Sequence, residues 1–338
     1  MGKTIDEDLK LGASLKEKSK EQMIAERLAI VVPCYNEEAV LHESCKRLTA
    51  LLQCLIDERE IAPNSFILFV NDGSRDHTWP IICQLHKENP LACGCNLAAN
   101  VGHQHALWAG LTVAMEHADI IVSIDADLQD DPEAIRQMVA KRKEGCDVVY
   151  GVRNERKTDT WFKRSTALAF YRLMHVMGTK TVYNHADFRL MSRRAVEHLL
   201  SFKERNLFIR GLVPLVGYES DCVYYNRAER FAGESKYPLT KMLNFAIDGI
   251  TSFSVKPIRL ITYLGVLFLI IALAVLVWII ALLITGEVVR GWSSLMVSVW
   301  FCSGCVLTAI GIVGEYIGKI YVESKERPMF NIESVLLK

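Results

Sequence analysis

Two long stretches without a charged residue constrain this chain more than any other feature of its sequence. The first runs from Leu260 to Gly286 and the second from Gly291 to Gly314. Each exceeds the roughly 20 apolar residues that a helix needs to cross a bilayer. The connection between them, near Glu287 to Arg290, is too short for a domain. The sequence therefore predicts a hairpin of two transmembrane helices.

Basic residues on the flanks of the spans predict their orientation. Those outside the hairpin are Lys256, Arg259, Lys319, Lys325 and Arg327, against only Arg290 inside it. By the positive-inside rule, the N-terminal part and the C-terminal tail lie in the cytoplasm. Residues 1–27 are charged throughout and lack the apolar core of a signal peptide. We therefore expect a multi-pass protein of the plasma (inner) membrane with a cytoplasmic N-terminal domain.

Apolar runs typical of buried strands alternate with segments of helical spacing over the first 150 residues. This alternation predicts a doubly wound, mostly parallel α/β sheet. The predicted strands are 28–32, 66–70, 95–98, 120–124 and 147–150, and the predicted helices are 37–58, 79–87, 104–118 and 132–144. Two amphipathic helices are predicted further on, at 163–177 and 237–254. The apolar stripe of the second indicates a position at the membrane interface, against the domain, or both.

Charge composition argues against a nucleic-acid partner. Lys plus Arg and Asp plus Glu each total 39, so the chain carries no net charge, and no basic tract stands out. Proteins that bind nucleic acid carry a basic patch or stripe. We therefore expect no nucleic-acid partner.

Two aspartates follow the predicted strand 120–124, at the end where α/β sheets bind their ligands. Asp125 and Asp127 are separated by one residue, and alternate residues of an extended segment point to the same side. Two carboxylates facing one ligand suit a hard divalent cation, Mg²⁺ or Mn²⁺, which keeps positions open for a diphosphate. The alternative is an ordinary acidic surface loop, because Asp-x-Asp alone is common.

Three more polar loops lie next to predicted elements. The first reads Val-Pro-Cys-Tyr-Asn-Glu and ends at Glu37; the second reads Asn-Asp-Gly-Ser-Arg-Asp-His-Thr and begins at Asn71. Tyr35 can stack on a base, and Glu37 or Asp72 can accept a hydrogen bond from a pyrimidine N–H. A tight turn with a helix cap is the alternative for the second loop. The third, Asn100–Gln104, leads into a predicted helix N-terminus, which favours anions.

The order of these motifs resembles that of a known enzyme family. They are Val-Pro-Cys-Tyr-Asn-Glu, Asn-Asp-Gly-Ser-x-Asp-x-Thr, Asn-x-Gly-His-x-x-Ala and Asp-Ala-Asp-Leu-Gln. The chain resembles the family 2 glycosyltransferases of the GT-A fold, and among them the polyisoprenyl-phosphate glycosyltransferases. That group includes dolichol-phosphate mannose synthases and bactoprenol (undecaprenyl-phosphate) glucosyltransferases. The more specific matching elements are Gly151–Arg153, Asp187–Leu190, Phe208–Leu212 and Arg230–Lys236. The resemblance spans about Leu28 to Arg259, and the two-helix hairpin agrees with the bactoprenol branch.

The resemblance implies roles for individual residues. The metal-binding element is matched by Asp125, Asp127 and Gln129, and the cation (Mg²⁺ or Mn²⁺) would neutralise the leaving diphosphate. The nucleotide-binding positions are matched by Pro33, Tyr35, Glu37, Asp72 and Asp125. The basic positions near the donor or acceptor phosphate are matched by Arg153, Arg189, Arg230 and Lys236, and arginine binds phosphate bidentately. The catalytic roles fall to Asp127, Asp187 and Arg153.

Asp187 has two candidate roles in the family pattern, general base or positioning residue. A phosphate monoester has a second pKa near ~6, so the acceptor phosphate is mostly a dianion at neutral pH. Such an acceptor needs alignment and charge screening more than proton removal. We therefore expect Asp187 to be a positioning residue, with general base as the alternative.

The resemblance implies inverting transfer of a single sugar from a nucleotide-sugar to a polyprenyl phosphate, such as undecaprenyl phosphate, at the cytoplasmic membrane face. The product would be a lipid-linked sugar donor for cell-surface glycan modification. The two-span architecture favours glucose from UDP-glucose; GDP-mannose, UDP-galactose or a modified pentose are the alternatives. A processive polysaccharide synthase would need a Gln-x-x-Arg-Trp element and more spans. A non-catalytic membrane scaffold is the alternative from another class, against which the complete Asp125, Asp127 and Gln129 set argues. The resemblance also implies a homo-oligomer, a tetramer.

The predicted organisation has five parts. They are a charged N-terminal extension (1–26), a GT-A glycosyltransferase domain (27–232), a juxtamembrane amphipathic segment (233–258), two transmembrane helices (259–318) and a cytoplasmic tail (319–338).

Overall fold

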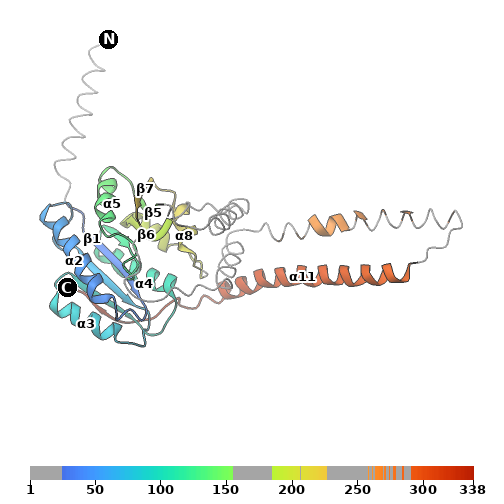
Figure 1. Ribbon diagram of the computed structural model, residues 1–338, viewed down its shortest axis with the longest axis horizontal. Helices are drawn as coiled ribbons and strands as arrows, with labels where there is room; N and C mark the ends of the chain where they lie inside the picture. The colour runs from blue at the N-terminus through green and yellow to red at the C-terminus, as the bar shows by residue number, and fades with distance from the viewer. Residues whose placement is uncertain are drawn as a thin grey trace, which may run out of the picture.

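The computed structural model describes residues 25–154, 185–205, 207–226 and 291–338, with scattered residues between 258 and 284. Three predicted segments lie outside the described residues: most of the N-terminal extension, the helix at 163–177 and nearly all of the juxtamembrane segment at 233–258. Figure 1 shows a sheet domain from which one long helix extends.

An eight-stranded sheet forms the centre of the domain, in the order β7-β5-β6-β4-β1-β2-β3-β8. The strands are β1 (Leu28–Cys34), β2 (Phe66–Asn71), β3 (Ala92–Leu97), β4 (Ile120–Ser123), β5 (Val148–Arg153), β6 (His185–Ser192), β7 (Ser220–Tyr225) and β8 (Ile332–Leu336). The four neighbours β4, β1, β2 and β3 run parallel, as do β5 and β7. All seven residues of β1 are buried, which fits a central parallel strand covered on both faces.

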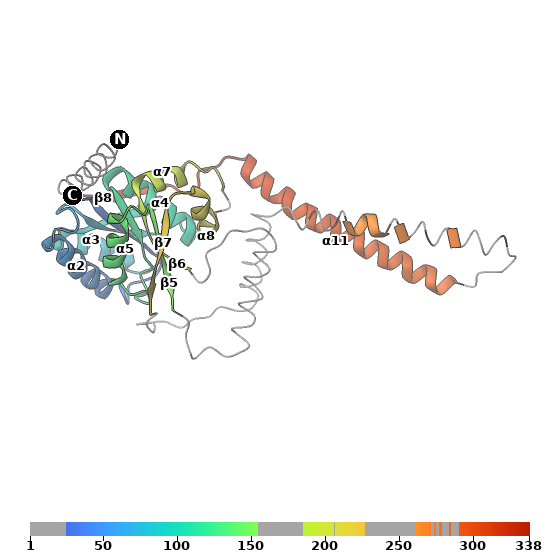
Figure 2. The ribbon, with the colours of Figure 1, turned by 90° about the horizontal axis from the view of Figure 1, so that it is seen from above.

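Helices cover both faces of the sheet, giving three layers (Figure 2). One face packs against α2 (Leu41–Asp57), α3 (Thr78–Glu88) and α5 (Ala134–Lys143). The other packs against α4 (His103–His117), α7 (Arg193–Leu200), α8 (Ile209–Leu212) and the 3₁₀ helix η1 (Val213–Val216). The predicted helices and the five predicted strands of the first 150 residues are confirmed to within a few residues.

The sheet is mixed, but most of its strands run in one direction, which agrees with the predicted mostly parallel arrangement. Strand β6 runs antiparallel between β4 and β5, and β8 runs antiparallel beside β3. Strand β6 was not predicted, because Asp187 and Arg189 interrupt its apolar pattern and yet are buried in the structure. Strand β8 was not predicted either, because it lies in the segment interpreted as a tail.

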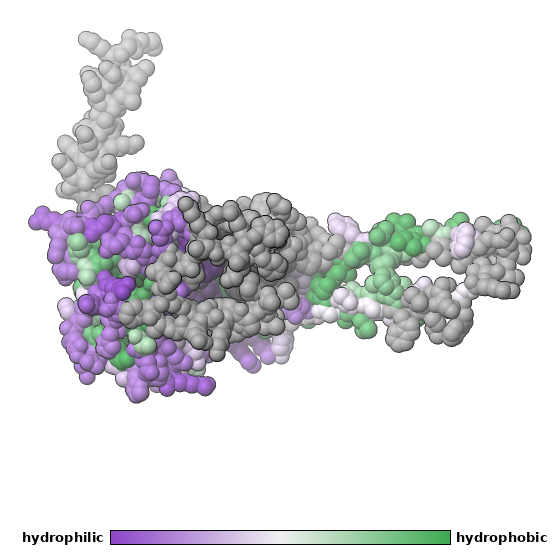
Figure 3. Space-filling model, viewed as in Figure 1, coloured by the Kyte–Doolittle hydropathy of each residue, from purple (hydrophilic) through white to green (hydrophobic). Residues whose placement is uncertain are grey.

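The long helix α11 (Trp292–Ser324) is the part of the chain that leaves the sheet domain. Among the described residues, one helical segment, Phe301–Ser324, is long and apolar enough to cross a membrane, and none of its most apolar window is buried by other described residues. Described residues of the first apolar stretch lie beside it, since the rings of Phe268 and Phe301 are 5.9 Å apart. Figure 3 shows apolar side chains along these segments and mainly hydrophilic ones on the sheet domain.

Candidate active site

The carboxyl ends of three parallel strands bring the polar loops that follow them together. Cys34 at the end of β1 pairs with Asn71 at the end of β2, and Val31 pairs with Ser123 at the end of β4. The loops that follow these three strands therefore emerge at one edge of the sheet. This edge is the expected ligand site of an open α/β sheet.

The first two loops are joined by hydrogen bonds from backbone N–H groups to side-chain oxygens. The N–H of Asn36 donates to the Ser74 hydroxyl at 3.0 Å, and the N–H of Arg75 donates to the Asn36 side-chain oxygen at 2.9 Å. The N–H of Glu37 donates to the Thr78 hydroxyl at 2.9 Å. Asn36 adopts a left-handed backbone conformation, with φ of 55°, which asparagine tolerates better than most residues. The two loops form one rigid unit.

The predicted nucleotide-binding residues on this unit differ in what they expose. The ring of Tyr35 is 43% exposed, so it is free to stack on a planar base. Glu37 is half-buried, whereas Pro33 is buried within β1. The burial of Pro33 does not fit direct contact with a nucleoside, and we interpret it as part of the strand that supports Tyr35.

Asp72 holds the loop before α4. Its carboxylate accepts hydrogen bonds from the N–H of Val101 at 2.7 Å, the N–H of Gly102 at 3.0 Å and the side chain of Asn100 at 3.1 Å. It is 2% exposed, and burial raises its pKa against the effect of these hydrogen bonds. The predicted contact of Asp72 with a nucleoside stays a prediction; in the structure its carboxylate is engaged with the loop before α4. Its neighbour Gly73 explains the close approach of the loops, because a Cβ there would lie 2.4 Å from the Asn100 nitrogen.

The Asp-x-Asp element lies in a turn, not in the extended segment from which its geometry was predicted. Strand β4 ends at Ser123, and Leu128 takes the left-handed conformation with φ of 58°. Asp125 and Asp127 are nevertheless both partly exposed, while Ala126 between them is buried. The carboxylate of Asp127 also accepts a hydrogen bond from the Gln129 N–H at 3.2 Å. The turn, rather than an extended segment, therefore presents both carboxylates at the sheet edge.

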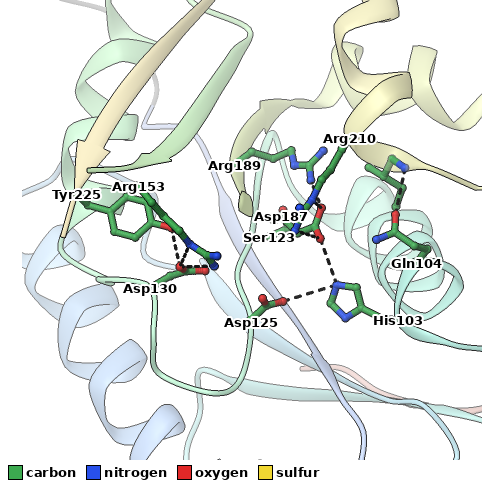
Figure 4. A network of polar contacts seen from close by, with 11 residues as sticks. His103, Gln104, Ser123, Asp125, Asp130, Arg153, Asp187, Arg189, Arg210 and Tyr225 are labelled. Carbon is green, nitrogen blue, oxygen red and sulfur yellow. Dashed lines mark hydrogen bonds and ion pairs between the residues drawn. The ribbon is translucent and has the colours of Figure 1, made fainter. Parts of the chain in front are cut away.

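His103, the first residue of α4, lies between two carboxylates (Figure 4). Its Nε2 is 3.6 Å from Asp125 Oδ1 and 3.8 Å from Asp187 Oδ2. Helix α4 lies directly on the sheet at Gly110, where a Cβ would be 2.4 Å from a methyl group of Val31. This close packing fixes where the helix begins and therefore where His103 lies.

Negative charge accumulates around Asp125. Burial raises its pKa to about 6; His103 opposes this shift, and the carboxylates of Asp187, Asp130 and Asp127 add to it. A cation bound at this position would relieve the repulsion among these groups. The site therefore favours positively charged ligands between Asp125 and Asp127.

Asp187 is the most heavily paired carboxylate of the site (Figure 4). It accepts from Arg189 Nη2 at 2.5 Å and from Arg210 Nε and Nη2 at 3.2 and 3.0 Å. Its backbone oxygen accepts from the Ser123 hydroxyl at 2.6 Å. Burial works to raise its pKa, but the charges of Arg210 and Arg189 are stronger and hold that pKa far below the ordinary range. A carboxylate this weakly basic does not suit a general base, which supports the predicted positioning role.

The two arginines bound to Asp187 differ in exposure. Arg189 is completely buried, and its Nε and Nη1 have no hydrogen-bond partner among the described residues. The predicted contact of Arg189 with a substrate phosphate stays a prediction; in the structure its guanidinium is buried against Asp187. Arg210 is 32% exposed, so its guanidinium reaches the surface of the site. Arg210 was not among the predicted site residues, although Arg210 lies in the Phe-Ile-Arg-Gly-Leu element that matches the family.

Arg153 is held by a second buried carboxylate. Asp130 Oδ1 accepts from Arg153 Nη2 at 2.9 Å and from the Tyr225 hydroxyl at 2.6 Å. Arg153 is 22% exposed and Asp130 is buried, with its Oδ2 unpartnered among the described residues. Two pairs, Asp187 with Arg210 and Asp130 with Arg153, thus flank Asp125 (Figure 4). Asp130 and Tyr225 were not predicted as site residues, because no motif in the sequence indicates that they bind Arg153.

The chemistry of the donor set fits a hard divalent cation. Asp125, Asp127 and Gln129 offer oxygen atoms only, as Mg²⁺ and Mn²⁺ prefer. Within the described residues, no group of three or more His, Cys, Asp and Glu side chains is arranged to hold a metal ion. Asp125, Asp127 and Gln129 would fill only part of an octahedral shell, which would leave positions for oxygens of a diphosphate. Two further predicted site residues, Arg230 and Lys236, lie outside the described residues.

Comparison with known proteins gives consistent matches over the chain. The model of glycosyl transferase family 2 matches residues 29–200. An uncharacterized glycosyltransferase, YkoT of Bacillus subtilis (strain 168), is 54% identical over 90% of this chain and 91% of that protein. The bactoprenol glucosyl transferase of Shigella phage SfV is 42% identical over 91% of this chain and 98% of that protein. A prophage bactoprenol glucosyl transferase homolog of Escherichia coli (strain K12) is 41% identical, over 91% and 99%.

Proposed function

The chain belongs to glycosyl transferase family 2, and from this premise we propose that it transfers one glucose from UDP-glucose to a polyprenyl phosphate. The acceptor is a lipid such as undecaprenyl phosphate, and transfer takes place at the cytoplasmic face of the membrane. The observation that carries the proposal is the likeness to proteins named bactoprenol glucosyl transferase. That likeness extends over 91% of this chain and so includes its apolar C-terminal region.

The donor site is the edge of the sheet at β1, β2 and β4. Tyr35 stacks on the base, with Glu37 beside it, and the diphosphate lies towards Asp125 and Asp127. When bound there by Asp125, Asp127 and Gln129, a divalent cation supplies a Lewis acid that stabilises the departing diphosphate. The exposed Tyr35 ring and the oxygen-only donor set support this arrangement.

The acceptor phosphate approaches from the side of Asp187. Arg210 binds this phosphate through its exposed guanidinium. The carboxylate of Asp187 holds the guanidinium in place, with Arg210 Nη2 3.0 Å from Asp187 Oδ2. One phosphate oxygen attacks the anomeric carbon of the sugar opposite the diphosphate, the bond from that carbon to the diphosphate breaks, and the configuration inverts. Because the phosphate is already mostly a dianion, no protein group needs to remove a proton. Arg153, Arg230 and Lys236 are further phosphate-binding candidates by family pattern.

The membrane anchor is a hairpin of two helices, the second of which is α11. Strand β8 follows α11 and pairs with β3, so the chain returns to the domain that it left. A chain that crosses a membrane and rejoins the same sheet must cross an even number of times. The contact between Phe268 and Phe301 supports two crossings, and so does the shortness of the connection between the apolar stretches.

The hairpin predicts which sites a membrane-impermeant thiol reagent reaches. In a variant whose native cysteines are replaced by serine, a cysteine at Glu287 should react from the extracytoplasmic side only. A cysteine at Ser324, the last residue of α11, should react only after the membrane is opened. Reaction of both sites from one side, or the reverse pattern, would contradict the hairpin or its orientation.

A panel of labelled nucleotide-sugars tests the donor. The full-length protein in detergent is incubated with undecaprenyl phosphate and UDP-glucose, UDP-galactose or GDP-mannose in turn. Lipid-extractable label from UDP-glucose alone would support the proposal, and label from another donor alone would replace the sugar but keep the reaction.

A further inference from the structure

The last strand of the chain is connected to the loops of the donor site by a continuous line of hydrogen bonds. Glu333 on β8 accepts from Asn96 Nδ2 on β3 at 2.6 Å. Asn96 Oδ1 accepts from Asn71 Nδ2 on β2 at 2.7 Å, and Asn71 Oδ1 accepts from the Ser74 N–H at 3.3 Å. We call this line, from Glu333 through Asn96 and Asn71 to Ser74, the amide chain. It extends to Asn36, whose N–H donates to the Ser74 hydroxyl.

The carboxylate of Glu333 fixes the direction of the amide chain. An ionised carboxylate only accepts hydrogen bonds, so Asn96 must turn its NH₂ group towards Glu333 and its oxygen towards Asn71. Asn71 must then donate its NH₂ group to Asn96, which leaves its own oxygen to accept from Ser74. Asn71 and Asn96 are 3% and 8% exposed, so the hydrogen bond between them is shielded from water, whereas Glu333 ends the amide chain at the surface.

Strand β8 is held in place independently of Glu333. It pairs with β3 over four residues, and Met329, Phe330 and Leu337 pack against the hydrophobic core. Near the end of the chain, the Lys338 ammonium donates to the Asn89 carbonyl at 3.0 Å. A substitution at Glu333 therefore interrupts the amide chain without releasing the strand.

From this geometry we infer that Glu333 is a positioning residue for the donor site. Its carboxylate orients Asn96 and Asn71, and these hold Ser74 and Asn36 in the unit that presents Tyr35. The inference rests on the proposed donor site at these loops. It gives the segment after the membrane helix a part in binding the nucleotide.

Three substitutions at Glu333 test the direction of the amide chain. Glu333→Gln keeps an acceptor and should behave like the wild type. Glu333→Ala removes the acceptor. Glu333→Lys offers a donor instead, which favours a flip of the Asn96 and Asn71 side-chain amides. The flip would place the NH₂ group of Asn71 against the Ser74 N–H. Glu326→Ala, a carboxylate removed from the turn after α11, is the matched control.

Hydrogen exchange and uridine diphosphate binding give separate measurements on these full-length variants. Exchange of the Ser74 and Asn36 amides should quicken in Glu333→Ala and further in Glu333→Lys, but not in Glu333→Gln or Glu326→Ala. The affinity for UDP with Mn²⁺ should fall about tenfold in Glu333→Ala, as for the loss of one charge-assisted hydrogen bond, while the KM for polyprenyl phosphate stays constant.

Two results would overturn the inference. One is unchanged hydrogen exchange at Ser74 and Asn36 in Glu333→Ala and Glu333→Lys; the other is an equal rise of the KM for the nucleotide-sugar and the KM for polyprenyl phosphate. Failure of the wild type to bind UDP or any other nucleotide would instead contradict the proposed function. In that event, hydrogen exchange still decides whether Glu333 orders the loops.

Discussion

Replacing Asp127 by alanine is expected to abolish sugar transfer while leaving the fold intact. Asp127 is partly exposed in a turn, and its carboxylate accepts a backbone hydrogen bond from Gln129 at 3.2 Å. Loss of that bond at the surface costs about 1 kcal/mol of stability. Loss of a metal ligand removes several kcal/mol of transition-state stabilisation, and about 4 kcal/mol corresponds to roughly a thousandfold in rate. Initial rates of transfer and the midpoint of thermal unfolding measure the two effects.

Asp131→Ala provides the matched control for Asp127→Ala. Asp131 is exposed in the same loop, and its carboxylate accepts a comparable backbone hydrogen bond from Glu133 at 3.1 Å. We expect this variant to retain nearly full activity and the same response to Mn²⁺ and EDTA. If Asp127→Ala transfers sugar at the wild-type rate in EDTA, the metal assignment is wrong.

Replacing Asp187 by asparagine is expected to reduce both stability and activity. The substitution leaves the buried Arg189 without a counter-charge, and breaking a buried ion pair in this way costs about 3–5 kcal/mol. It also releases Arg210, which the carboxylate holds at 3.0 Å, so transfer should fall about a hundredfold, the effect of losing a well-positioned charged contact. Chemical denaturation and steady-state kinetics measure the two losses.

A double variant separates these two effects of Asp187. Asp187→Asn combined with Arg189→Met removes the buried orphan charge, so most of the stability should return. Activity should stay low, because Arg210 is still without its partner. The pH dependence of the residual activity should match that of the wild type. A stable Asp187→Asn single variant whose rate regains the wild-type value at high pH would identify Asp187 as a general base and contradict the positioning role.

The sequence predicts the first half of the fold well because its elements have simple patterns. The strands that became β1, β2 and β4 are apolar runs buried on both faces, and polar turns separate them from amphipathic helices. The convergence of their loops then follows from parallel pairing alone. The position of these loops at the sheet edge could therefore be predicted without knowledge of side-chain contacts.

Two of the strands that were not predicted, β6 and β8, depend on tertiary contacts more than on local pattern; β7 was not predicted either. Strand β6 carries Asp187 and Arg189 in the centre of the sheet, where each neutralises the other. Strand β8 is short and partly exposed, and only its pairing with β3 makes it a strand. Asp187 and Arg189 are close in sequence, but the local pattern does not show that the pair is buried, and the pairing of β8 with β3 joins distant parts of the chain.

The site residues divide in the same way. The position of Asp125 and Asp127 follows from the end of a strand, so it was predictable. Pro33, Asp72 and Arg189 are buried, and their burial depends on what surrounds each side chain. A motif matched by residue type does not reveal burial. His103 and Arg210 gain their roles from Asp187, which lies far from both in the sequence.

The central claim is that the chain moves a sugar from a nucleotide to a membrane lipid phosphate. The measurement that tests it most directly follows label from UDP-glucose, with the purified full-length protein in liposomes that do or do not contain undecaprenyl phosphate. We expect an organic-soluble glucosyl lipid that forms only with the acceptor present, and only with wild-type Asp127. Release of free glucose at the same rate in both kinds of liposome, or no consumption of any nucleotide-sugar, would contradict it.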